Sequence, residues 1–286
     1  MKKLFGLIVN SRPYSWGDLV VLGFLAKFMA IKKLEFEPRD LSMVSCLLSL
    51  WLFFNFILEN RHDYPGRQNV SKTFSYVWLA LAGTMALTAN VQAQALILVS
   101  TFFVYVYLYK NKNVVLGVTS SLTRGVIQVI YFLIAAQFYT QAGGDWKIIS
   151  LIVLIALVAR SIAGDIRDTK IDTKKNKQTI SVRFGDKTAK AATIIFLLIL
   201  VIVEVRHFGS LWISLPALVF ALTLSVNNNG YVLYQASAVF TTFTSLNLIA
   251  VYTGGNLTLL NIVFIGSWLN LIFYPLLDRG SNPIFR

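Results

Sequence analysis

Long apolar runs recur along the whole chain, and they restrict the possible folds more than any other feature of the sequence. The runs match the length of about 17 to 25 residues that a helix needs to cross the hydrocarbon core of a bilayer. Of the 286 residues, 56% are hydrophobic and 14% are charged, and the mean hydropathy is +0.64. Soluble domains are much less apolar, and the alternating segments of a membrane β-barrel are absent. We therefore predict an all-α membrane protein.

The apolar runs divide the chain into ten candidate spans, or nine if one of them is peripheral. No linker or low-complexity tract separates two domains, so we predict a single domain over residues 1–286 that forms a polytopic transmembrane helical bundle. The candidate spans are 17–33, 42–60, 74–90, 92–110, 114–140, 147–167, 188–206, 211–227, 231–252 and 257–277.

The net charge of +13 comes from Lys and Arg residues in short loops between the apolar runs. This is the positive-inside pattern, and it predicts that the loops 60–73, 110–113 and 168–190 lie in the cytoplasm. Orientation and contact with anionic membrane lipids explain the charge, so we expect no nucleic-acid partner. We expect a multi-pass protein of a prokaryotic cell membrane.

Two acid-bearing segments lie where apolar runs end, and both fall on the predicted cytoplasmic side. Their spacing of three or four residues places the side chains of each segment on one helical face. Polar groups at membrane depth are costly, so these faces should point into the bundle. The residues are Asn55, Glu59 and Asp63 in the first segment and Asp165, Asp168 and Asp172 in the second.

Clustered oxygen ligands next to cations favour a site for Mg²⁺ and phosphate. Mg²⁺ binds through a few carboxylates and keeps positions for substrate phosphate oxygens. We assign Arg67, Lys110 and Arg167 to the diphosphate. A metal that neutralises a leaving diphosphate favours ionisation of an isoprenyl diphosphate, whose apolar chain would lie among the helices. Motifs of nucleotide-driven pumps, serine hydrolases and zinc enzymes are absent.

Two arginines, Arg124 and Arg160, lie within apolar runs. An unpaired cation is costly there. We therefore expect each of them to pair with an acid or to face the phosphate site.

The two acid segments resemble the signatures of the UbiA-type intramembrane prenyltransferase family. That family has an Asn followed at four-residue intervals by two Asp residues, and here Glu59 takes the middle place. Its second signature is a pair of Asp residues four positions apart with another Asp just upstream, here Asp168 and Asp172 with Asp165 before them. The signature continues with a Gly, where this chain has Asn176, and then with a Thr-Leu-Pro-Val-like stretch, here Thr179-Ile-Ser-Val182. Weaker matches are Arg12-Pro13 and the pair Tyr105 and Lys110. The loop through Arg67 departs from the family pattern.

The resemblance implies a central prenyl-diphosphate cavity that opens to the cytoplasmic side and binds two Mg²⁺ ions. It also implies that five residues take part in both catalysis and metal binding, and that a sixth residue, an acid, is a metal ligand only. The catalytic residues would be Asn55, Glu59, Asp63, Asp168 and Asp172, and Asp165 would be the additional metal ligand.

The leading interpretation is a Mg²⁺-dependent enzyme that transfers a prenyl group from its diphosphate to an unidentified acceptor. The acceptor could be aromatic or a lipid, and the prenyl length is open. A terpene cyclase on the same scaffold is an alternative, since it would share the ionisation step. An ion-coupled secondary transporter is a third, although it predicts acids near the midplane rather than at helix ends.

Overall fold

The computed structural model describes residues 16–32, 35–58, 72–139 and 145–254. Within these ranges all regular secondary structure is helical, which confirms the all-α prediction there. The chain forms two compact units. The first takes its described residues from 1–98, 133–141 and 252–286, and the second takes them from 99–132 and 142–251.

The first unit contains α2 (Trp16–Ile31), α3 (Pro38–Leu58), α4 (Lys72–Ala86) and the beginning of α5 (Val91–Leu108). Helix α3 packs against both α2 and α4. Apolar side chains fill this unit, and fully buried examples include Phe28, Leu47 and Phe54. Close van der Waals packing of such side chains helps to hold helices together in a membrane, where the surrounding lipid is as apolar as the side chains themselves.

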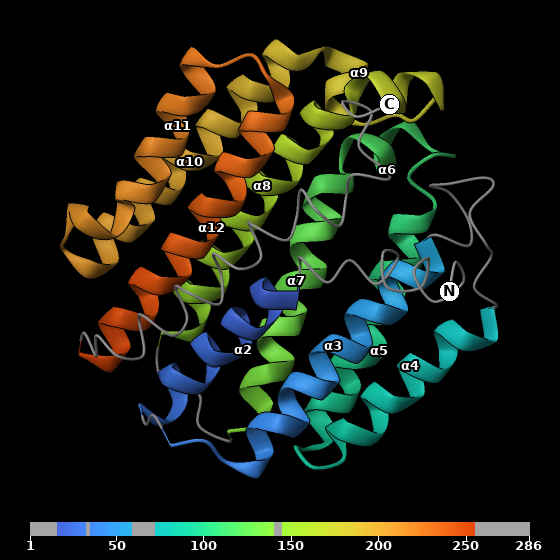
Figure 1. Cartoon of the computed structure of the whole chain (residues 1–286), viewed down its shortest axis with the longest axis vertical. Helices are drawn as coiled ribbons and strands as arrows, with labels where there is room; N and C mark the ends of the chain where they lie inside the picture. Colours follow the sequence, from blue (N-terminus) through green and yellow to red (C-terminus); the bar gives the residue numbers. More distant parts are fainter. Residues whose placement is uncertain (1–15, 33–34, 59–71, 140–144, 255–286) are drawn as a thin grey trace, which may run out of the picture. The chain divides into compact units, whose positions relative to one another are not determined.

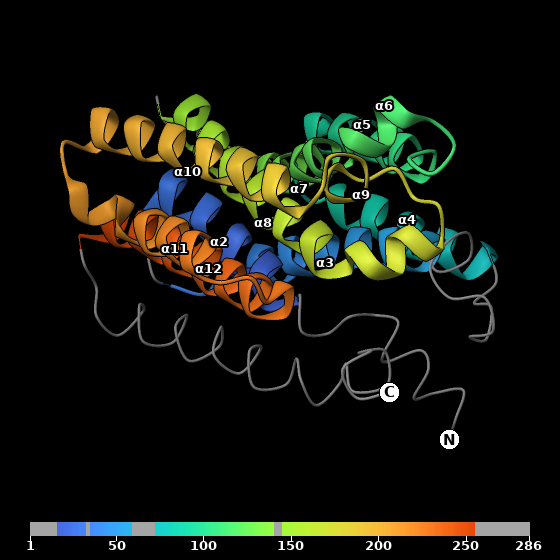
Figure 2. The ribbon, with the colours of Figure 1, turned by 90° about the horizontal axis from the view of Figure 1, so that it is seen from above.

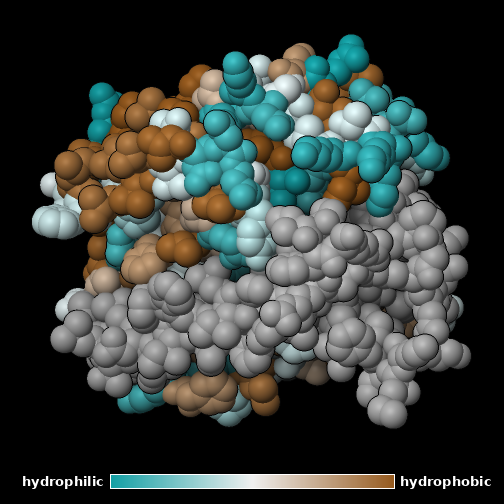
Figure 3. Space-filling view, turned by 45° about the horizontal axis from the view of Figure 1, so that its top comes forward, coloured by the Kyte–Doolittle hydropathy of each residue, from teal (hydrophilic) through white to brown (hydrophobic). Residues whose placement is uncertain are grey.

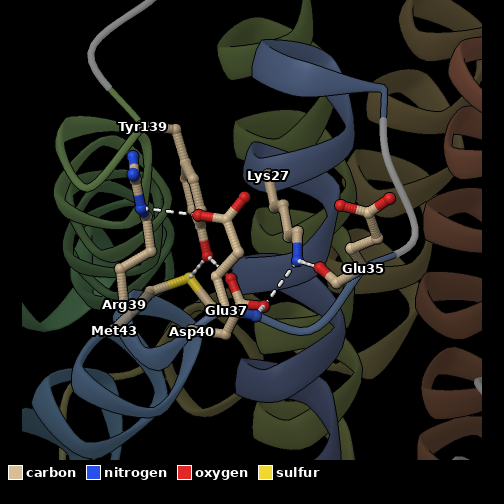
Figure 4. A network of polar contacts seen from close by, with 7 residues as sticks. All are labelled: Lys27, Glu35, Glu37, Arg39, Asp40, Met43 and Tyr139. Atoms are coloured by element: carbon tan, nitrogen blue, oxygen red, sulfur yellow. Dashed lines mark hydrogen bonds and ion pairs between the residues drawn. The ribbon is translucent and has the colours of Figure 1, made fainter.

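A buried polar network fixes the start of α3 (Figure 4). Pro38 occupies the first turn, where its missing N–H costs nothing, and Asp40 accepts a hydrogen bond from the backbone N–H of Glu37 at 2.8 Å. Asp40 also accepts hydrogen bonds from Lys27 of α2 and from the hydroxyl of Tyr139, each at 2.5 Å. The carboxylate thus caps its own helix and ties it to two other segments.

The second unit contains the end of α5, α6 (Val114–Val118), most of α7 (Ser120–Gln137) and α8 (Trp146–Lys174). It continues through α9 (Ile180–Phe184), α10 (Asp186–Phe208), a short 3-10 helix (Leu211–Ser214), α11 (Leu215–Val226) and α12 (Gly230–Thr253). Helices α8, α10, α11 and α12 lie side by side in both ribbon views (Figure 1 and Figure 2). The long α8 carries the second acid segment.

Two of the predicted boundaries differ from the structure in ways that matter for the site. The predicted span 114–140 is interrupted at Thr119, where a Thr-Ser-Ser run with low helix propensity follows Gly117. Helix α8 continues past residue 167 to Lys174, because the polar residues that follow are compatible with a helix. Part of the predicted loop 168–190 is therefore helical. The predicted span 257–277 lies outside the described residues.

Five helices of the described chain are long and apolar enough to cross a membrane, namely α3, α5, α8, α10 and α12. On α10 and α11, large apolar side chains such as Ile195, Ile202, Val219 and Leu222 are exposed. Figure 3 shows hydrophobic side chains over this region of the surface. Exposed apolar faces of this kind fit contact with lipid.

Candidate functional site

The predicted site residues fall into three groups in the structure. Asp165, Asp168, Asp172, Arg167 and Lys110 all belong to the second unit, whereas Asn55 belongs to the first. The remaining predicted residues, Glu59, Asp63 and Arg67, lie outside the described residues. Their assignment stays a prediction.

Asp165 lies on α8 and meets polar side chains from two other segments. The hydroxyl of Ser121 on α7 donates a hydrogen bond to Asp165 Oδ2 at 2.8 Å. Lys110, two residues after the end of α5, and Arg124 on α7 both interact electrostatically with the carboxylate. An acid and two cations thus share one place in the second unit, and Arg124 has the carboxylate of Asp165 within electrostatic range.

Lys110 is held in place by an aromatic side chain one turn before it. Its Nζ donates a hydrogen bond to the Tyr107 hydroxyl at 2.7 Å and lies 4.0 Å from the centre of the same ring. The Arg124 guanidinium lies 5.8 Å from that ring, so Tyr107 contacts both cations through cation–π attraction. Only 8% of Lys110 is exposed, and its charge interacts electrostatically with Asp165 and Asp172 of α8.

Asp168 and its neighbour Arg167 form a bidentate pair. Arg167 donates to the two carboxylate oxygens at 2.8 and 2.7 Å, and its guanidinium lies 4.0 Å from the ring centre of Tyr234 on α12. Gly230 makes this arrangement possible, because a Cβ there would come within 2.9 Å of the Arg167 Cα. The close approach of α12 to α8 therefore positions Arg167.

Asp172 lies in the last turn of α8 and pairs with Lys177, whose Nζ is 2.9 Å from Oδ1. Asn176 precedes this lysine and adopts a positive φ of 52°, the left-handed conformation that Asn tolerates better than most residues. In the family signature this position is Gly. Replacement of the signature's Gly by Asn176 thus keeps the backbone conformation, since Asn176 adopts the left-handed turn that a glycine would make.

Asn55 lies in α3 and is fully buried. Its side-chain amide donates to the Trp51 carbonyl at 2.9 Å, whereas its Oδ1 accepts no hydrogen bond within the described residues. A buried carbonyl oxygen without a donor is costly, and a hard cation would satisfy it.

Each unit carries donors that suit Mg²⁺ by their chemistry. The second unit offers carboxylate oxygens of α8 and the first offers the amide oxygen of Asn55, and this ion prefers oxygen ligands of both kinds. Within the described residues no three His, Cys, Asp or Glu side chains come together as a metal site. Instead, Asp168 and Asp172 are each neutralised by a nearby cation.

Sequence reasoning did not assign Ser121, Tyr107 or Lys177 to the site. Ser121 carried a signal, because it lies three residues before Arg124 and therefore on the same helical face. Tyr107 stands at the same three-residue distance before Lys110, although the sequence comparison favoured Tyr105 as its partner. Lys177 was one basic residue among several, and nothing local distinguished it.

Arg160, the second arginine within an apolar run, lies near the middle of α8. Its guanidinium donates to the Thr241 hydroxyl of α12 at 3.0 Å. Arg160 and Arg167 are seven residues apart, so both lie on the helical face that contacts α12.

Comparisons with known proteins agree with this architecture. The model of the UbiA prenyltransferase family matches residues 67–249, and no curated protein matches the chain. The structure of a digeranylgeranylglyceryl phosphate synthase aligns with a TM-score of 0.68 at 16% identity, covering 89% of this chain and 100% of that chain.

Two further solved structures align over nearly their whole length. A UbiA homologue from Archaeoglobus fulgidus, bound to GPP and Mg²⁺, has a TM-score of 0.60 at 16% identity, and the alignment covers 95% of this chain and 99% of that one. The apo UbiA homologue from Aeropyrum pernix K1 has a TM-score of 0.54 at 14% identity, with 92% and 98% covered. At these identities the likeness establishes a shared fold.

Proposed function

The chain belongs to the UbiA prenyltransferase family, and from this premise we propose that it is a Mg²⁺-dependent intramembrane prenyltransferase. It ionises an isoprenyl diphosphate and transfers the prenyl group to an aromatic or lipid acceptor. We further propose that residues 1–286 form one domain of nine or ten spans, with a cavity that opens to the cytoplasm.

The grouping of Asp165 with Ser121, Lys110 and Arg124 supports this proposal most directly. Acids alone would suit a metal, and cations alone would suit any anion. A carboxylate that accepts from a buried hydroxyl and faces two cations suits a diphosphate held between metal and protein. The apolar helices around it suit a prenyl chain.

We assign the roles of the side chains accordingly. Lys110, Arg167 and Arg67 bind the diphosphate, and Tyr107 orients Lys110. Ser121 orients Asp165. Mg²⁺, when bound, neutralises the charge that develops on the departing diphosphate. The proposed ligands for two such ions are Asn55, Glu59, Asp63, Asp165, Asp168 and Asp172.

The test is turnover by the purified protein in lipid nanodiscs. Isoprenyl diphosphates of several lengths are supplied with Mg²⁺, and released pyrophosphate is measured with and without a lipid extract that includes glyceryl phosphate lipids. Mass spectrometry then identifies the prenylated product. A product that requires the extract supports a transferase, whereas a cyclic hydrocarbon without any acceptor would identify a cyclase.

The variant Asp172→Asn should reduce pyrophosphate release to background while leaving the protein folded. Asp145→Asn is the matched control, since it makes the same change just before the opposite end of α8, where the side chain is 45% exposed. Full activity of Asp172→Asn, or no pyrophosphate release from any diphosphate, would contradict the proposal. Membership of the family favours this chemistry over ion-coupled transport.

A further inference from the structure

Lys177 is placed by a specific helix-ending motif at the end of α8. The Lys177 N–H donates to the Asp172 carbonyl at 3.0 Å, and the Asn176 N–H donates to the Thr173 carbonyl at 3.1 Å. These two bonds, with the left-handed Asn176 between them, form a Schellman motif. The motif folds the chain back, so that the side chain of Lys177 returns over the last turn of the helix.

The contact between Lys177 and Asp172 is unusual for this motif. The two positions are commonly occupied by apolar residues that pack on each other, whereas here they hold a buried ion pair with side chains 10% and 6% exposed. Buried ion pairs are often no more stabilising than apolar residues of similar size. Stability alone therefore does not account for the charges, and one partner, Asp172, is a proposed metal ligand.

We propose that Lys177 is the resident counter-ion of Asp172 in the metal-free protein and a ligand of the donor's diphosphate in the loaded one. When Mg²⁺ binds Asp172, the ammonium of Lys177 loses its partner and turns to the phosphate oxygens. The inference rests on the proposed function, because it takes Asp172 as a metal ligand and a prenyl diphosphate as substrate.

The neighbouring acid repeats the arrangement in a more open setting. Arg167 neutralises Asp168 through two hydrogen bonds, with side chains 27% and 34% exposed. Each of the last two acids of α8 thus has a basic side chain close to it in the chain. Removal of a cation from a carboxylate by a metal makes that cation available to a phosphate, so the binding of metal and of diphosphate should be coupled.

The experiment compares the wild type with Lys177→Met in nanodiscs, using Mg²⁺ alone and then inorganic pyrophosphate at saturating Mg²⁺. Without a competing ammonium, the variant should bind Mg²⁺ at least about fivefold more tightly, and it should bind pyrophosphate at least about fivefold more weakly. Its thermal midpoint without metal should fall, because Asp172 loses its counter-ion. Calorimetry and a thermal shift assay measure these quantities without turnover.

Two further variants make the result decisive. Lys174→Met removes the same charge from an exposed position at the end of α8 and should change both affinities by less than about twofold. Changes of the same sign in both affinities of Lys177→Met, or no change, would overturn the counter-ion role. If Asp172→Asn binds Mg²⁺ as well as the wild type does, the metal assignment in the proposed function fails. A loss of Mg²⁺ binding in that variant, with unchanged Lys177→Met affinities, removes the counter-ion proposal alone.

Discussion

The buried pair of Lys27 and Asp40 offers a sharp test of how the first unit is stabilised. Lys27 is 1% exposed and Asp40 is not exposed at all. The carboxylate accepts hydrogen bonds from Lys27, from the Glu37 backbone and from Tyr139. Lys27 also donates to the Glu35 carbonyl. Both charges are thus paired inside a largely apolar unit.

Removing either charge alone should be strongly damaging, because the other charge stays buried without its partner. Asp40→Asn leaves the Lys27 ammonium buried without a counter-ion, and Lys27→Met leaves the carboxylate with only its two neutral donors. Each change should lower the free energy of unfolding by about 3–5 kcal/mol. The double variant should cost less than the sum of the single changes, with a coupling of roughly 2–3 kcal/mol.

The assay is reversible unfolding in mixed micelles, followed by tryptophan fluorescence across a denaturant titration for the wild type and the three variants. Arg39→Met is the control, because it breaks an ion pair with Glu37 whose side chains are 48% and 30% exposed. It should cost no more than about 1 kcal/mol. Additivity of the two single variants within about 0.5 kcal/mol would refute the argument.

Backbone geometry supplies the remaining predictions. Asn176→Val should lower the free energy of unfolding by about 1–2 kcal/mol, because a β-branched residue is strained at a φ of 52°. Asn176→Gly should be as stable as the wild type. A loss of stability in both variants would contradict this reason. Gly117→Ala should cost about 1–3 kcal/mol through overpacking, since a Cβ there would lie 2.5 Å from the Cβ of Gln178. Gly83→Ala is its control, because nothing lies within 4 Å of a Cβ at that position, and thermal unfolding compares all four variants.

The helical arrangement of the second acid segment follows from local sequence alone. Asp165, Asp168 and Asp172 are spaced for one helical face, and α8 carries all three. Such spacing is informative because the pitch of a helix does not depend on its surroundings. The resemblance to the UbiA family was also confirmed, since the family model matches residues 67–249.

For the first acid segment, the sequence predicted correctly where one residue lies. Asn55 was expected at depth, and it is buried in α3 with an oxygen that finds no donor in the described chain. Its partners in the signature, Glu59 and Asp63, lie outside the described residues, and the metal-binding role of all three stays a prediction.

The sequence by itself predicted a helical chain in a membrane, with acids and bases gathered where apolar runs end. These properties depend on each residue and its near neighbours, through hydropathy and helical pitch. Only the tertiary structure decided which cation meets which acid. Ser121 reaches Asp165 across 44 positions, and Lys177 reaches Asp172 only because Asn176 turns the chain back. Such pairings depend on helix packing and on single backbone angles, which spacing along the chain does not encode.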